Sequence, residues 1–140
     1  MDPFIKEIQQ INTVEDAINK LNTQTEITPK LNEIINFIIE AHEGQYRKSG
    51  EPYCVHPILV ASITAHFSKD EAIIATALLH DVVEDTHFSL EYVKETWGSD
   101  IAHMVDGLTK IVEIREHEFI ASNDASDSKI ISSALTFRKM

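Results

Sequence analysis

The feature that most constrains this chain is an apolar stretch that runs directly into a group of ionisable residues. Residues 72–79 read Ala-Ile-Ile-Ala-Thr-Ala-Leu-Leu, and His80 and Asp81 follow without a break in the pattern. A helix that is apolar on every side belongs in a protein core. The sequence therefore predicts a buried helix whose C-terminal end carries ionisable side chains.

The acidic residues at the end of this helix are unfavourable unless a cation offsets them. Asp81, Glu84 and Asp85 lie at the negative end of the helix dipole, where each carboxylate costs about 0.3–1 kcal/mol. Burying a carboxylate costs more, unless it is paired or coordinated. No Lys or Arg occurs between Glu71 and Tyr92 to offset the charge. We infer that this segment holds a cation.

The spacing of these residues predicts a metal site with ligands from more than one helix. His80 and Glu84 are four residues apart, as are Asp81 and Asp85, so each pair shares a helix face. The adjacent His80 and Asp81 point about 100° apart, so together they can bind only one side of an ion. Other ligands must then come from elsewhere in the chain. His56, at the start of the preceding helix, is a candidate third ligand. Imidazole and carboxylate ligands together suit manganese, iron or zinc, and the carboxylates favour the harder ions.

A non-metal interpretation stays open from these residues alone. A His-Asp dipeptide is a weak signal in a chain with seven histidines, although the buried setting strengthens it. Cys54 is better explained as a small buried hydrophobe than as a ligand. The remaining histidines lack a partner at metal-binding spacing and are interpreted as structural or solvent-facing: His42, His66, His87, His103 and His117.

The rest of the sequence predicts an all-α fold. The chain is 43% hydrophobic, with four Gly and four Pro, and its apolar residues recur at helical spacing. Thr28 is expected to cap one helix, Ser68 and Glu71 to form a capping box, and Gly98 to end another. The expected helices span residues 3–21 with a break near 12–13, 29–42, 56–67, 72–83, 89–97, 100–114 and 128–140, with loops at 44–52 and 115–128.

The charge and the N-terminus limit the partners and the location. A net charge of −11 over 140 residues argues against a general electrostatic footprint for nucleic acid, so an anionic substrate needs local positive charge or a metal. The single cysteine fits a reducing compartment. The N-terminus does not resemble a signal peptide, and no apolar run approaches the about 20 residues of a membrane span. We expect a cytoplasmic protein that binds neither nucleic acid nor membrane.

Several stretches resemble motifs of the Rel/SpoT family of (p)ppGpp hydrolase-synthetases. Residues 44–53, Gly-Gln-Tyr-Arg-Lys-Ser-Gly-Glu-Pro-Tyr, followed by His56-Pro57, closely resemble the first motif of that family. Residues 78–86, Leu-Leu-His-Asp-Val-Val-Glu-Asp-Thr, resemble the second. Residues 105–110 and 137–140 resemble two further stretches of its long, multidomain members. A generic HD protein would share only three of these residues, at positions 56, 80 and 81.

The resemblance implies an all-α HD-domain bundle that uses Mn²⁺ to hydrolyse (p)ppGpp to GDP or GTP and pyrophosphate, within a bifunctional stringent-response enzyme. By motif position the metal ligands would be His56, His80 and Asp81. Glu84 and Asp85 would be the catalytic acidic pair. The residues expected to contact the guanosine nucleotide are Arg47, against the base, and Lys48, Ser49 and Tyr53.

One departure from the family concerns the C-terminal end. The family completes its metal site with an Asp in a later Leu-Ala-Asp-Arg-Leu-like motif, which does not occur here and is expected beyond Met140. We therefore expect residues 1–140 to be the N-terminal part of an HD hydrolase domain, incomplete at its C-terminus and weak or inactive alone. Synthetase and regulatory domains would follow in the full-length protein.

Two alternative functions remain. The chain could be a stand-alone HD phosphohydrolase that acts on another nucleotide, such as a 3′-phosphorylated cofactor. Residues 105–110 and 137–140 favour the long enzymes instead. It could also be a non-catalytic helical module that regulates or dimerises, but such a module has no reason to keep the unfavourable acidic cluster.

Overall fold

The computed structural model describes residues 3–108, and every regular element in that range is an α-helix. The all-α expectation is therefore confirmed. The expected loop at 115–128 and the expected helix at 128–140 lie outside the described residues. Residues 99–108, the described part of the helix expected over 100–114, are helical. The labelled helices are α1 (Pro3–Gln9), α2 (Val14–Gln24), α3 (Pro29–Ala41), α4 (Val55–Phe67), α5 (Glu71–Asp85) and α6 (Leu90–Trp97).

Several helix boundaries follow from local capping. The side chains of Thr13, Thr28 and Ser89 each accept a hydrogen bond from the backbone amide three residues ahead, which caps α2, α3 and α6. Gly98 ends α6 with a φ of 111°, which glycine adopts without strain. The expected break near residues 12–13 and the expected caps at Thr28 and Gly98 are confirmed.

The expected capping box at Ser68 and Glu71 is wrong. Asp70 caps α5 instead, because its carboxylate directly precedes the helix and accepts from the backbone amides two and three residues ahead. Ser68 ends α4, and its hydroxyl accepts from the Asp70 amide at 3.3 Å. The Glu71 carboxylate accepts a 2.6 Å hydrogen bond from the hydroxyl of Thr28, so it ties α5 to the start of α3.

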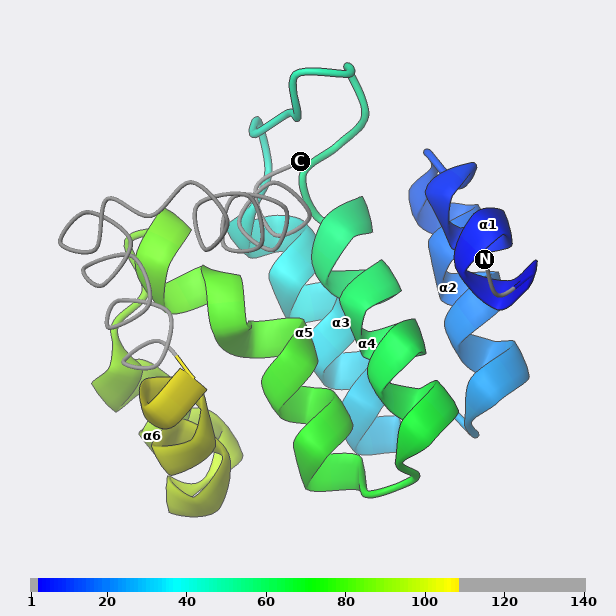
Figure 1. The fold of residues 1–140 in the computed structure, drawn as a ribbon. Coiled ribbons are helices and arrows are strands. Elements are labelled where there is room, and N and C mark those ends of the chain that lie inside the picture. The colour runs from blue at the N-terminus through cyan, green and yellow to red at the C-terminus, as the bar shows by residue number, and fades with distance from the viewer. Residues whose placement is uncertain (1–2, 109–140) are drawn as a thin grey trace, which may run out of the picture.

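Helices α3, α4 and α5 form the centre of the molecule, with α2 packed on α4 (Figure 1). The α1–α2 pair lies on one side of this centre and α6 on the other (Figure 1). Residues 74–82 of α5 are all buried, including Leu78 and Leu79 with no exposed surface. Burying a side chain of that size contributes about 1.5–3 kcal/mol. The C-terminal end of α5 is therefore held firmly by the core.

Within residues 3–108, none of the helices combines the length and the apolar character that crossing a lipid bilayer requires.

Candidate metal centre

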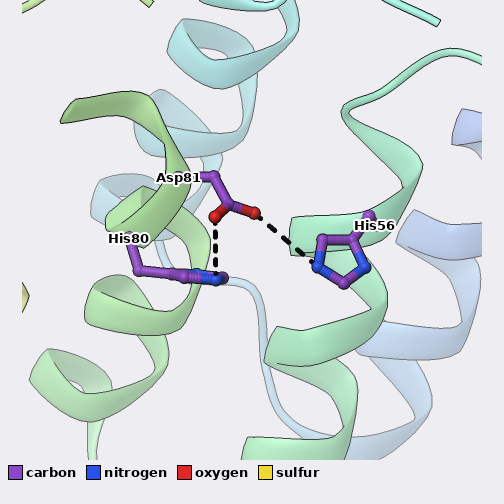
Figure 2. A group of neighbouring side chains, drawn as sticks. All are labelled: His56, His80 and Asp81. Atoms are coloured by element: carbon purple, nitrogen blue, oxygen red, sulfur yellow. Dashed lines mark ion pairs between the residues drawn. The ribbon is translucent and has the colours of Figure 1, made fainter. Parts of the chain in front are cut away.

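Three side chains from two central helices meet at the C-terminal half of α5. His56 comes from the first turn of α4, whereas His80 and Asp81 come from α5. One carboxylate oxygen of Asp81 lies 3.6 Å from His56 Nε2, and the other lies 3.2 Å from His80 Nε2 (Figure 2). The side chains are only 4%, 8% and 1% exposed for His56, His80 and Asp81. The structure thus brings together the three predicted ligands, which we call the triad.

The donor set of the triad fits a divalent metal ion. His80 Nδ1 lies 2.7 Å from the carbonyl oxygen of Ala77, and a carbonyl only accepts, so Nδ1 carries the proton. In a neutral ring, Nε2 then presents a lone pair toward a carboxylate oxygen of Asp81. Two hydrogen-bond acceptors at this distance repel each other unless a cation lies between them. Metal-ligating histidines typically donate their other ring nitrogen in this way.

A second acidic group continues from the triad to the surface. Potential ligand atoms of Asp81, Glu84 and Asp85 lie within 4.8 Å of one another, as do those of the triad. Asp81 is buried, whereas Glu84 and Asp85 are exposed in the last turn of α5. The carboxylates are therefore divided into one that faces the histidines and two that a substrate or water can reach. That division suits separate roles in metal binding and in proton transfer.

The loop before α4 folds into a tight hairpin. Tyr46 and Pro52 form an isolated antiparallel bridge, and the Arg47 amide donates to the Glu51 carbonyl at 3.0 Å. Gly50, at the turn, has a φ of 101°, a conformation that glycine tolerates. The two arms of this loop therefore hold the residues between them in a defined conformation.

Arg47 is the loop cation that faces inward. Its side chain is 7% exposed, and its Nε lies 3.7 Å from a carboxylate oxygen of Glu51. Burial lowers the pKa of Arg47, while the negative charges of Glu51 and Asp81 oppose that shift. Even a lowered guanidinium pKa leaves the group charged near neutral pH. The carboxylate of Asp81, a member of the triad, thus favours the charged form of Arg47.

Lys48 and Ser49, by contrast, remain at the exposed tip of the loop. The Ser49 hydroxyl donates to the Glu51 carboxylate at 2.9 Å. Of the four residues expected to contact a nucleotide, the structure brings only Arg47 and Tyr53 toward the triad.

Tyr53 connects the loop to the acidic pair. Its hydroxyl donates to a carboxylate oxygen of Asp85 at 2.9 Å. The pKa of Tyr53 is raised, first by burial and then by the negative charge of Asp81 and the bond to Asp85. Its ring lies 4.9 Å from that of His42 and 6.2 Å from that of His56, centroid to centroid. Tyr53 therefore stays protonated and acts as a fixed donor to Asp85.

Gln45 and His42 also lie beside this centre, although the sequence predicted no role for Gln45 and only a structural or solvent-facing role for His42. His42 is buried, and its Nδ1 lies 2.8 Å from the side-chain oxygen of Gln45. The Gln45 side-chain nitrogen donates to the backbone oxygen of Asp85 at 2.7 Å. The one available signal was the position of Gln45, two residues before Arg47 in the same motif.

The other residues that were weighed as ligands fall outside the centre. Cys54 is buried, burial raises the pKa of its thiol, and it belongs to neither metal-compatible group within residues 3–108. His66, His87 and His103 are exposed, and His117 lies outside the described residues.

The chain is similar to a known family and to several proteins. The family model described as HD domain matches residues 35–140. A GTP pyrophosphokinase of Myxococcus xanthus is 50% identical over 101 residues, which cover 72% of this chain and 12% of that protein. A guanosine-3′,5′-bis(diphosphate) 3′-pyrophosphohydrolase of Haemophilus influenzae is 49% identical over 76 residues, which cover 54% of this chain and 11% of that protein. A protein of the same name from Aquifex aeolicus is 34% identical over 119 residues, which cover 85% of this chain and 17% of that protein. The chain thus spans less than a fifth of the length of these relatives.

Proposed function

The chain belongs to the HD-domain family, and on that basis we propose that it forms a metal-dependent phosphohydrolase site that removes pyrophosphate from (p)ppGpp. The observation that carries the proposal is the buried triad of His56, His80 and Asp81 with two exposed carboxylates directly beside it. The substrate is supported by the relatives named for 3′-pyrophosphate hydrolysis of guanosine 3′,5′-bis(diphosphate).

The metal we propose is Mn²⁺, held by His56, His80 and Asp81. Two imidazoles and a carboxylate suit manganese, iron or zinc, and the neighbouring Glu84 and Asp85 favour the harder manganese. A bound divalent ion lowers the pKa of a water molecule and stabilises charge on a phosphoryl oxygen.

The residues beside the triad handle protons and charge. Glu84 and Asp85 orient the water that attacks the phosphorus attached to the ribose 3′-oxygen, and one of them protonates that oxygen as its bond to phosphorus breaks. Tyr53 holds the Asp85 carboxylate in place through its 2.9 Å hydrogen bond. The products are pyrophosphate and GDP or GTP.

The loop supplies the positive charge that an anionic substrate needs in a chain of net charge −11. Arg47 contacts the guanosine nucleotide, and Tyr53 lies beside it. Lys48 and Ser49, exposed at the tip, take part only when the substrate extends over the loop.

A product assay tests this function. A purified version that extends past Met140 is incubated with (p)ppGpp and Mn²⁺, and the nucleotides are separated by chromatography. We expect GDP or GTP and pyrophosphate in equal amounts, and no product after the metal has been chelated. Turnover of a 3′-phosphorylated cofactor in place of (p)ppGpp would instead identify a stand-alone HD phosphohydrolase. Absence of metal binding would favour the non-catalytic module.

We also propose that residues 1–140 are the N-terminal part of a longer cytoplasmic enzyme with synthetase and regulatory domains. The small share of each relative that the chain spans supports this arrangement. A fourth ligand, the Asp expected after Met140, would then complete the metal site. A version extended by roughly sixty residues should hydrolyse (p)ppGpp at least about tenfold faster than the 140-residue chain, since loss of a supporting group at a metal site typically costs about 10–100-fold. Equal rates would show that these 140 residues already complete the site.

A further inference from the structure

Gln45 connects the loop before α4 to the end of α3 and to the end of α5. Its backbone amide donates to the His42 carbonyl at 3.0 Å, and its carbonyl accepts from the Tyr53 amide at 2.9 Å. Its side-chain nitrogen donates to the Asp85 carbonyl at 2.7 Å, and its side-chain oxygen lies 2.8 Å from His42 Nδ1. The backbone and side-chain polar groups of this residue are therefore all engaged, with His42, Tyr53 and Asp85 as partners.

The partners of Gln45 fix the direction of each hydrogen bond. The Asp85 carbonyl can only accept, so the amide nitrogen of Gln45 must face it. The amide oxygen then faces His42, and His42 must donate from Nδ1. His42 Nε2 is buried and has no hydrogen-bond partner among residues 3–108, which suits a neutral ring. A single orientation of Gln45 thus also selects the ring tautomer of His42.

The bond to Asp85 lies where α5 needs a donor. The last carbonyls of a helix have no partner within the helix, and a donor near them is also favoured by the helix dipole. Gln45 satisfies the backbone of Asp85 while Tyr53 holds its carboxylate at 2.9 Å. The two arms of the hairpin therefore both contact Asp85, and Arg47 lies between them in sequence.

We propose that Gln45 is a positioning residue that sets the spacing between the Arg47 loop and the Asp85 carboxylate. Gln45 itself touches neither the metal nor the reacting atoms. It keeps the loop and the helix end at one separation, so that a nucleotide bound by the loop meets the acidic pair in a productive geometry. The inference rests on the proposed function for its catalytic consequence, but the hydrogen-bond arrangement stands independently of it.

Three variants test this role in a form of the protein that hydrolyses (p)ppGpp. Gln45→Glu keeps the side-chain shape and can still accept from His42, but it cannot donate to the Asp85 carbonyl. Gln45→Leu removes both bonds. The matched control is Gln10→Glu, the same substitution at an exposed glutamine outside the helices. Each variant is assayed for kcat, KM, Mn²⁺ affinity and thermal midpoint.

We expect Gln45→Glu to lower kcat by about 10–100-fold, in the range seen for supporting groups at metal sites, with a smaller change in KM and unchanged Mn²⁺ affinity. Gln10→Glu should behave as the parent. A kcat for Gln45→Glu equal to that of the parent would overturn the proposal. A parallel loss of Mn²⁺ affinity would also overturn it, because it would show that Gln45 supports the triad rather than Asp85.

Nuclear magnetic resonance of the His42 ring separates a failure of this inference from a failure of the proposed function. In the parent protein the ring should be the Nδ1–H tautomer, and Gln45→Leu should abolish that preference and speed amide exchange at Tyr53. If these signals appear but (p)ppGpp is not hydrolysed, the substrate proposal fails and the arrangement stands. If (p)ppGpp is hydrolysed but His42 carries its proton on Nε2, the arrangement assigned to Gln45 is wrong.

Discussion

The triad and the loop before α4 reach the same place in the molecule by different means. His56, His80 and Asp81 lie on two central helices, and none of their side chains is more than 8% exposed. Arg47 and Tyr53 lie on or beside a hairpin whose tip is exposed. The triad is placed by the packing of the core, whereas the loop depends on a few hydrogen bonds.

This difference bears on which region would hold a metal ion and which would contact a substrate. A ligand on a buried helix cannot move without disturbing the core, so its position is fixed before any ion arrives. A loop can adjust to a substrate, but only as far as its anchors allow. In this protein the anchors are Gln45 and Tyr53, which both bond to Asp85. The acidic pair at the end of α5 is therefore where the rigid and the adjustable regions meet.

The largest expected effect is on the rigid side. Asp81→Asn should reduce Mn²⁺ affinity by at least about 100-fold and abolish detectable hydrolysis, because it removes the negative charge that lies between two imidazoles. Titration calorimetry with Mn²⁺ measures the first effect and the product assay measures the second. Asp100→Asn, at an exposed position, is the matched control. Unchanged Mn²⁺ affinity for Asp81→Asn would place the metal somewhere other than the triad.

The next effect should fall where the two regions meet. Glu84→Gln and Asp85→Asn should lower kcat by about 10²–10⁴-fold, the usual contribution of general acid–base catalysis, while metal content stays nearly unchanged. Single-turnover rates and elemental analysis of the purified variants provide both measurements. Loss of the metal from Glu84→Gln would make Glu84 a ligand and would extend the rigid site to the surface.

A smaller effect distinguishes two neighbouring cations of the loop. Arg47→Ala should raise KM by about 10–100-fold, because it removes charged hydrogen bonds to substrate worth about 1.5–3 kcal/mol. Lys48→Ala should raise KM by only about threefold, since an exposed side chain contributes a weak, solvent-screened interaction. Steady-state kinetics of both variants give the two KM values to be compared. Equal effects would mean that the loop closes over the substrate and brings its tip into contact.

The smallest effect tests the boundary of the triad. Cys54→Ala removes a buried sulfur two residues before His56 and should lower the free energy of unfolding by about 1 kcal/mol. Mn²⁺ affinity should not change, because the thiol belongs to neither metal-compatible group among the described residues. Chemical denaturation and the same Mn²⁺ titration check both statements. A weakened metal site in this variant would add Cys54 to the ligands.

The sequence alone determined the fold class and several helix ends. Apolar spacing identified α5 as a buried helix, and short-range signals located the cap at Thr28 and the end at Gly98. These properties depend on neighbours within a few residues, so local pattern is sufficient to predict them. The candidate site residues were named from charge, spacing and motif resemblance, and their chemical roles remain predictions.

Only the tertiary structure decided which residues meet. The side chain of Gln45 bonds to Asp85 across 40 residues of sequence, and the phenol of Tyr53 bonds to the same residue across 32. Local pattern likewise could not show that Glu71 would bond to Thr28 on another helix, or that Lys48 would stay exposed while Arg47 turned inward. Such contacts arise when helices pack against one another, because packing brings distant parts of the chain within hydrogen-bonding reach.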